Sequence, residues 1–85
     1  MDWNEAAADL LHQILQLTPR PERDQAERQI RAIAESLAEE DGVARVGVKT
    51  VVRAWVRNTP ETLRGELSRR MEMLGLDPDD FPVEE

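Results

Sequence analysis

Few residues in this chain could carry out chemistry. The sequence has 85 residues, no cysteine and one histidine, His12. A thiolate nucleophile, a disulfide and a cysteine-held zinc or iron–sulfur site are therefore excluded. There is no glycine-rich phosphate loop, and no serine and histidine pattern that indicates nucleophilic catalysis. The sequence predicts a protein that has no enzymatic activity of its own and needs no cofactor.

Two acidic groups are candidate metal sites. Glu5, Asp9 and His12 would share one side of a helix, but one imidazole and two surface carboxylates make a poor site without further ligands. The three aspartates within residues 77–80 lack the glycine and the distal glutamate of a twelve-residue calcium loop. We expect solvated side chains at both places, so no metal site is predicted.

The most distinctive pattern is a row of basic residues spaced four apart, called the basic row below. Its members are Arg45, Lys49, Arg53 and Arg57. Like charges at this spacing on a helix repel one another slightly, so something should compensate them. The alternatives are solvent and salt, an acidic protein partner, a phosphate-bearing ligand or nucleic acid, and the chain's own acidic residues 77–85. A net charge of −7 disfavours nucleic acid, whose phosphates would be repelled, so we expect a protein partner.

The aromatic residues are Trp3, Trp55 and Phe81, which are too few for a base-stacking platform. We expect both tryptophans to anchor the core, because large aromatic side chains bury much apolar area. The alternative is that Trp3, His12 and Trp55 contact a ligand.

The spacing of apolar residues predicts the elements that position these side chains. We expect an all-α fold, a small bundle of four helices, with a short extended stretch at Ala44–Val46. The predicted helices cover residues 3–17, 21–41, 47–57 and 60–74. Valines between residues 43 and 57 also suit a strand, but a helix separates the apolar face from the basic row.

The sequence also predicts which residues cap two of the helices and what the last helix packs against. Asp2 should cap the first helix, and Thr59 should cap the last. The last helix carries an apolar stripe that could pack on its own chain or on a second copy. The stripe consists of Leu63, Leu67, Met71 and Leu74. Because a small chain gains core by pairing, we expect this stripe to form the interface of a homodimer or of a partner-stabilised domain.

The chain is expected to form one helical domain, residues 1–76, followed by a flexible acidic tail, residues 77–85. No apolar run approaches the roughly 20 residues that span a bilayer. Asp2 and Glu5 stand where a signal peptide would carry basic residues. These features predict a cytoplasmic protein that does not bind membranes.

The order of residues between positions 3 and 56 resembles a known family. The chain opens with Trp3-Asn4-Glu5-Ala6, a tryptophan followed by an alanine-bearing helix. Further along the chain, residues of the types found in that family follow in the same order. They are Pro19, Arg23, Ala26, Ile30, Ala34, Gly42, Val46, Val48, Val51 and Ala54. In this order they resemble the small helical domain at the C-terminus of the B subunit of light-independent protochlorophyllide reductase. That domain also occurs as a short free-standing protein.

The resemblance implies an appended helical module near the substrate and partner surfaces of a reductase-type complex. It carries over no catalytic residue, because the cluster and most of the substrate pocket belong to the larger part of that complex. It also raises an alternative, a tetrapyrrole-binding accessory protein with Trp3, His12 or Trp55 at the pocket. Arg31 and Lys49 stand where the family has acids, and Gly47 stands at its threonine cap. An identical contact surface is therefore not expected.

Overall fold

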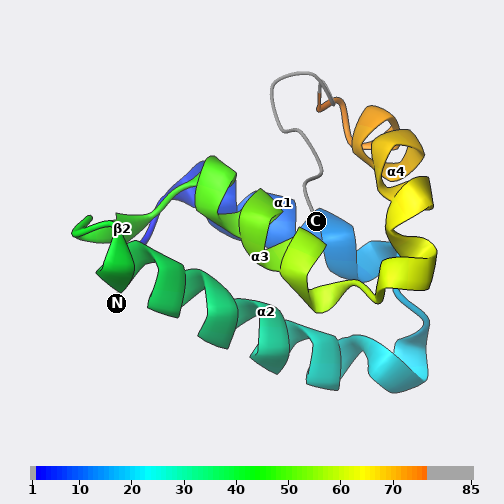
Figure 1. Cartoon of the computed structure of the whole chain (residues 1–85), viewed down its shortest axis with the longest axis horizontal. Coiled ribbons are helices and arrows are strands. Elements are labelled where there is room, and N and C mark those ends of the chain that lie inside the picture. Colours follow the sequence, from blue (N-terminus) through cyan, green and yellow to red (C-terminus); the bar gives the residue numbers. More distant parts are fainter. Residues whose placement is uncertain (1, 77–85) are drawn as a thin grey trace.

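Most residues of this protein are helical in its computed structural model, which describes residues 2–76 (Figure 1). The elements in chain order are β1 (Asp2–Trp3), α1 (Glu5–Gln16), α2 (Arg20–Glu40), β2 (Arg45–Val46), α3 (Val48–Asn58), the 3₁₀ helix η1 (Glu61–Glu66) and α4 (Leu67–Met73). This arrangement confirms the predicted all-α fold with a short extended stretch before the third helix.

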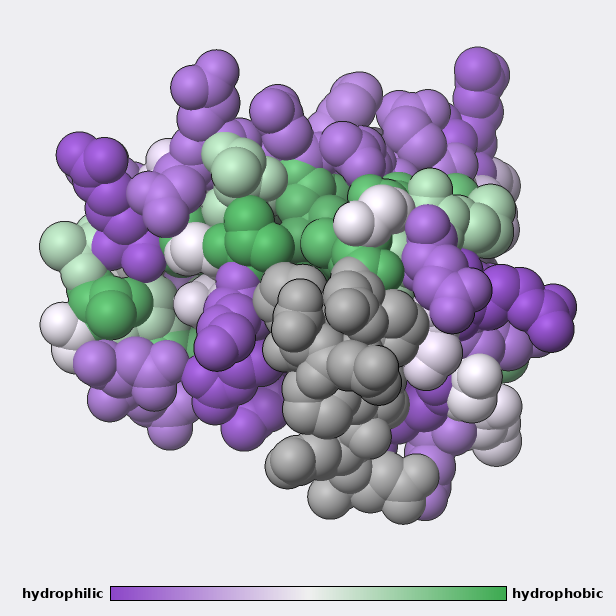
Figure 2. All heavy atoms as spheres, turned by 90° about the horizontal axis from the view of Figure 1, so that it is seen from above, coloured by the Kyte–Doolittle hydropathy of each residue, from purple (hydrophilic) through white to green (hydrophobic). Residues whose placement is uncertain are grey.

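Helix α3 lies at the centre of the packing. Its largest contact is with α2, and it also packs against α1. The helices η1 and α4 close the end of the molecule where α2 begins and α3 ends (Figure 1). The largest fully buried side chains are Leu11, Ile14, Ile30, Leu37, Val46, Val51, Leu67 and Met71. Seen from above, apolar residues form a band between rows of hydrophilic side chains (Figure 2).

A two-stranded parallel sheet joins the start of the chain to the segment before α3. Asp2 pairs with Arg45 and Trp3 pairs with Val46, and the backbone N–H of Asn4 donates to the Val46 carbonyl over 2.9 Å. Because this pairing holds residues 2 and 3 extended, α1 begins only at Glu5. The prediction that Asp2 caps the first helix is therefore wrong. Asn4 occupies the cap position and makes no side-chain capping hydrogen bond.

Thr59 belongs to the end of α3 and not to the start of the last helix. Its side-chain hydroxyl donates to the Trp55 carbonyl over 2.8 Å, and its backbone N–H also donates to that carbonyl. Such bonds satisfy a carbonyl that the helix end leaves unpaired. The predicted capping role of Thr59 for the last helix is wrong, because the hydroxyl points back to α3. Pro60 is the residue that precedes η1.

The last predicted helix, residues 60–74, is divided into two parts. Residues Glu61–Glu66 are a 3₁₀ helix without a buried residue, and regular α-helix covers only Leu67–Met73. A 3₁₀ helix turns further per residue than an α-helix, so it rotates Leu63 out of line with the next apolar positions. Leu63 is accordingly 44% exposed, whereas Leu67 and Met71 are fully buried.

This burial corrects the predicted oligomer interface. Leu67 and Met71 are enclosed by the core of their own chain, and Leu74 packs against that core while partly exposed. In the single chain Leu67 and Met71 are therefore not at the surface, and of the stripe only Leu63 is largely exposed. The stripe completes the monomer's core, because α4 folds back over it. The homodimer itself stays a prediction, which sedimentation at high protein concentration would check.

Two methionines of α4 give a direct test of this packing. Met71 is 0% exposed and Met73 is 66% exposed. We expect Met71→Ala to lower the free energy of unfolding by about 2–5 kcal/mol, because it removes buried apolar area and leaves a cavity. Met73→Ala is the control and should change it by no more than about 0.5 kcal/mol. Urea unfolding followed by circular dichroism measures both values. Equal effects would show that α4 does not pack as described.

Candidate functional site

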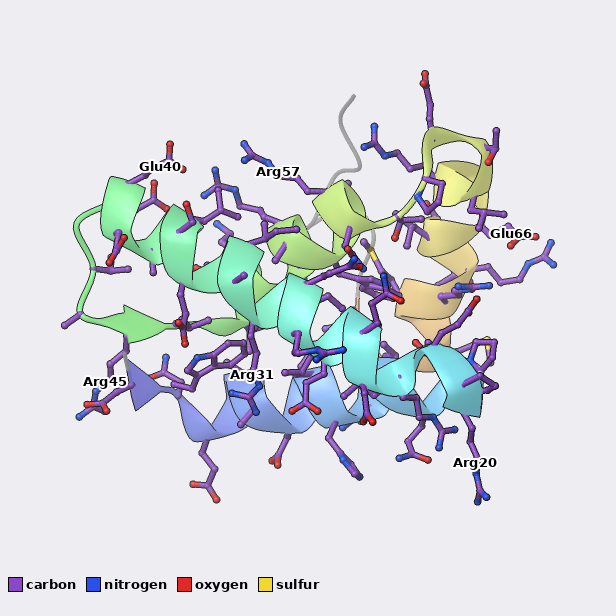
Figure 3. All side chains as sticks on the ribbon, turned by 90° about the horizontal axis from the view of Figure 1, so that it is seen from below. Arg20, Arg31, Glu40, Arg45, Arg57 and Glu66 are labelled. Atoms are coloured by element: carbon purple, nitrogen blue, oxygen red, sulfur yellow. The ribbon has the colours of Figure 1, made fainter. Side chains whose placement is uncertain are left out.

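The exposed surface of α3 is a narrow strip made only of basic residues. Its three exposed residues are Lys49, Arg53 and Arg57, spaced one helical turn apart. One such step advances about 6 Å along the helix axis. Arg45 is also exposed, but it lies in β2 ahead of the helix. Arg45 and Arg57 are well separated in Figure 3.

The burial pattern of α3 explains why only this strip reaches solvent. Its buried residues are Thr50, Val51, Val52, Ala54, Trp55 and Val56. In a helix, residues four apart lie on one face, so the basic positions share the arc that the buried residues leave open. The exposed residues of α2 mix acidic and basic side chains, and the charged residues of α1 are acidic, whereas α3 presents only positive charge.

The structure shows partial compensation for the charge of the basic row. The Nη1 atom of Arg53 lies 3.0 Å from Oδ2 of Asp41, the residue that follows α2. Asp2 is the strand partner of Arg45. Within residues 2–76, Lys49 and Arg57 form no ion pair. Arg45 faces Asp2 only in the strand register, so within these residues three positive charges of the row have no ion-pair partner, and Arg53 alone is shared, with Asp41. The prediction that residues 77–85 compensate the row concerns residues outside the described part of the chain. The same is true of the calcium site that was considered there.

Trp3 has a structural role at the junction of β1 and α2. Its indole Nε1–H donates to Oε2 of Glu35 over 3.1 Å, and the guanidinium carbon of Arg31 lies 5.0 Å from the ring centroid. Arg31 is itself held by Glu27, whose Oε2 accepts from the arginine Nε over 3.1 Å. A cation over an indole face is favourable. Arg31 therefore helps to hold Trp3 in place. At this position the family that the sequence resembles has an acidic residue.

The side chains predicted as possible ligand contacts do not form one pocket. Trp3 is half-buried against α2, His12 is exposed on α1, and Trp55 is only 5% exposed within the core. Trp55 borders a groove that neither Trp3 nor His12 lines. Within residues 2–76, no group of three His, Asp or Glu side chains could hold a metal ion. The arrangement favours a structural role for Trp3, whereas Trp55 belongs both to the core and to the lining of the groove.

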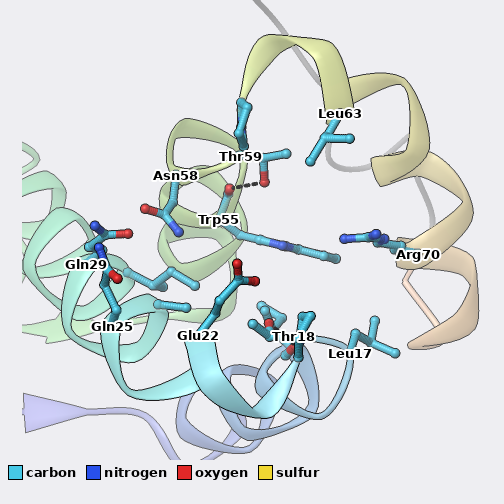
Figure 4. Close-up of a pocket in the computed structure, with 15 residues that line it drawn as sticks. Leu17, Thr18, Glu22, Gln25, Gln29, Trp55, Asn58, Thr59, Leu63 and Arg70 are labelled. Carbon is cyan, nitrogen blue, oxygen red and sulfur yellow. Dashed lines mark hydrogen bonds between the residues drawn. The ribbon is translucent and has the colours of Figure 1, made fainter.

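The groove beside Trp55 is a feature that sequence reasoning missed. It encloses about 420 Å³ where the end of α1, the start of α2, the end of α3 and the pair η1 and α4 meet. Ile14, Ile30 and Trp55 contribute apolar surface, and Leu63 and Arg70 lie beyond one end of the indole (Figure 4). No local spacing indicates this groove, because its lining residues come from four separate segments.

Comparisons with known proteins do not assign the chain to a family. No protein-family model, no curated protein and no solved structure was found to match it. The resemblance to the reductase domain thus stays a prediction. In the part of the chain that the structure describes, no helix combines the length and apolar character needed to cross a bilayer.

The Arg53–Asp41 contact gives a testable estimate of how firmly the basic row is held. Both side chains are about half exposed, so solvent screens their attraction. We expect a double-mutant cycle with Asp41→Asn and Arg53→Gln to give a coupling free energy of about 0.2–1 kcal/mol, falling as salt is added. The exposed pair Arg70–Glu66, in the cycle Glu66→Gln and Arg70→Gln, is the comparison. A larger coupling that resists salt would show that Arg53 is locked and unavailable.

Proposed function

We propose that this protein is a non-catalytic interaction module that docks on an acidic surface of a protein partner through the basic row. One observation carries the proposal: every exposed residue of α3 is basic. Lys49 and Arg57 have no ion-pair partner within residues 2–76, so a partner's carboxylates would meet free cations. A rigid, buried helix holds these cations at fixed spacing, which supports recognition of a patterned surface.

The spacing of the cations favours an acidic helix as the partner surface. Carboxylates at every fourth residue of a helix repeat at about 6 Å, the same interval as Lys49, Arg53 and Arg57 on α3. Exposed charge pairs each contribute only about 0–1 kcal/mol. The row should therefore increase the association rate and set the register, while affinity stays modest and sensitive to salt. Arg53 would exchange Asp41 for a carboxylate of the partner.

The resemblance of residues 3–56 to the reductase domain suggests where a natural partner should be sought. The larger subunits of a reductase-type complex are the first candidates. Nucleic acid would use the same cations, but the chain has 18 acidic against 11 basic residues. This excess of negative charge opposes any acidic partner, and it opposes a DNA duplex most, because a duplex carries one charge per about 1.7 Å of its axis, against one per about 6 Å on the acidic helix. We therefore place the acidic protein surface ahead of nucleic acid.

A charge-reversal experiment tests the docking surface. The probe is a synthetic alanine-based helix with glutamate at every fourth position, titrated at an ionic strength of about 0.01 M, where screening is weak. We expect ¹⁵N NMR shifts centred on the basic row and loss of binding in Lys49→Glu/Arg57→Glu. The control Arg28→Glu/Arg69→Glu makes the same charge change at exposed residues of α2 and α4. It should retain most of the affinity.

Two outcomes would contradict this assignment. Equal losses in the two double variants would mean that net charge and not the row governs binding. Tighter binding of a DNA duplex than of the acidic helix, at matched salt, would favour the nucleic-acid alternative, since phosphate contacts give a steep salt dependence.

A further inference from the structure

The groove beside Trp55 lies on a different side of α3 from the basic row. Trp55 and Asn58 line the groove, whereas Lys49, Arg53 and Arg57 occupy the opposite arc of the helix. A ligand in the groove would therefore not contact the row. At about 420 Å³, the groove is within the range of about 300–1,000 Å³ that is usual for binding sites.

One side of the groove carries three uncharged amides. Gln25 and Gln29 project from α2, and Asn58 projects from the end of α3 to the same side of the indole (Figure 4). Their side chains make no hydrogen bond to other described residues. Each amide offers two donors and one acceptor, which is the combination that pairs with a peptide backbone.

The spacing of these amides matches an extended peptide. Gln25 and Gln29 are one turn apart on α2, about 6 Å along the axis. Backbone groups that face the same way in an extended chain repeat every two residues, or about 6.7 Å. The two glutamines can thus bond successive same-facing peptide groups without a change in the helix.

The other residues that line the groove indicate which side chains such a peptide would carry. Ile14 and Ile30 line the groove but are almost fully buried, and Trp55 is 5% exposed, so Leu63, which is 44% exposed, offers much of the accessible apolar surface. Glu22 lies beneath the indole and Arg70 lies beyond its far end, so opposite charges face different parts of the groove (Figure 4). Arg70 is 3.6 Å from Glu66, a long contact that leaves other guanidinium N–H groups free.

We propose that this groove binds an extended peptide segment of a partner protein. One bulky apolar side chain of the peptide lies against Trp55 and Leu63. The peptide backbone pairs with the amides of Gln25, Gln29 and Asn58. A basic residue on one side of the apolar anchor faces Glu22, and an acidic residue on the other side faces Arg70. The groove is therefore a second recognition site, independent of the basic row.

The test uses capped serine heptapeptides with a central phenylalanine, a lysine toward one end and an aspartate toward the other, in both orders. Binding to the full chain is followed by ¹⁵N NMR of side-chain amides and of the Trp55 indole. We expect one order to bind more tightly and to shift the signals of Gln25, Gln29, Asn58 and Trp55. Replacing the central phenylalanine by serine should abolish binding.

Variants separate this site from a general surface effect. Gln25→Ala/Gln29→Ala should weaken binding by about tenfold, the effect of losing two ordinary hydrogen bonds. Gln13→Ala/Gln16→Ala removes two exposed glutamines of α1 outside the groove and should change nothing. Lys49→Glu/Arg57→Glu should also retain peptide binding. Circular dichroism confirms that each variant is folded.

Three results would overturn the proposal. The first is no shift of the groove signals up to the solubility limit of the phenylalanine peptides. The second is equal weakening by the two glutamine double variants. The third is binding only to a chain that ends at Leu76, which would assign the groove to the chain's own residues 77–85 and not to a partner.

Discussion

Helix α3 is buried around most of its circumference, and the other elements are arranged about that burial. Val51, Ala54 and Trp55 are within the core, where α3 packs against α1 and α2. Fully burying one large apolar side chain contributes about 1.5–3 kcal/mol, so this helix supplies much of the stabilisation that a small domain needs. The same burial confines the solvent-facing part of α3 to its basic positions. The burial of α3 thus both stabilises the fold and leaves a basic surface on this helix.

The main elements could be predicted because their signals are local. Apolar residues recurring at helical spacing indicated all of the α-helices, and the separation of valines from the basic row favoured a helix over residues 47–57. The ends were less predictable, since tertiary contacts decide them. Asp2 has a good capping side chain, yet pairing with Arg45 holds it in a strand. Leu63 fits the spacing of the last stripe, yet the 3₁₀ geometry turns it outward.

The candidate site shows the same division between local and distant information. The basic row is visible in the sequence because four-residue spacing on one helix defines it. Its ion-pair partner Asp41 is not, because the contact depends on where α2 ends relative to α3. The groove beside Trp55 is still less predictable, since it exists only where four segments converge. His12, the most reactive side chain by type, is exposed on α1 and has no part in either surface.

The parallel strand pairing also has a consequence for the order in which the chain can fold. β1 pairs with β2 across about forty intervening residues, so closing this contact costs considerable loop entropy. In the folded chain Trp3 also contacts α2, through Glu35 and Arg31. During synthesis, residues 2 and 3 leave the ribosome long before their partners in β2 exist. The β1–β2 ladder must therefore form late, after the whole of α2 has been made.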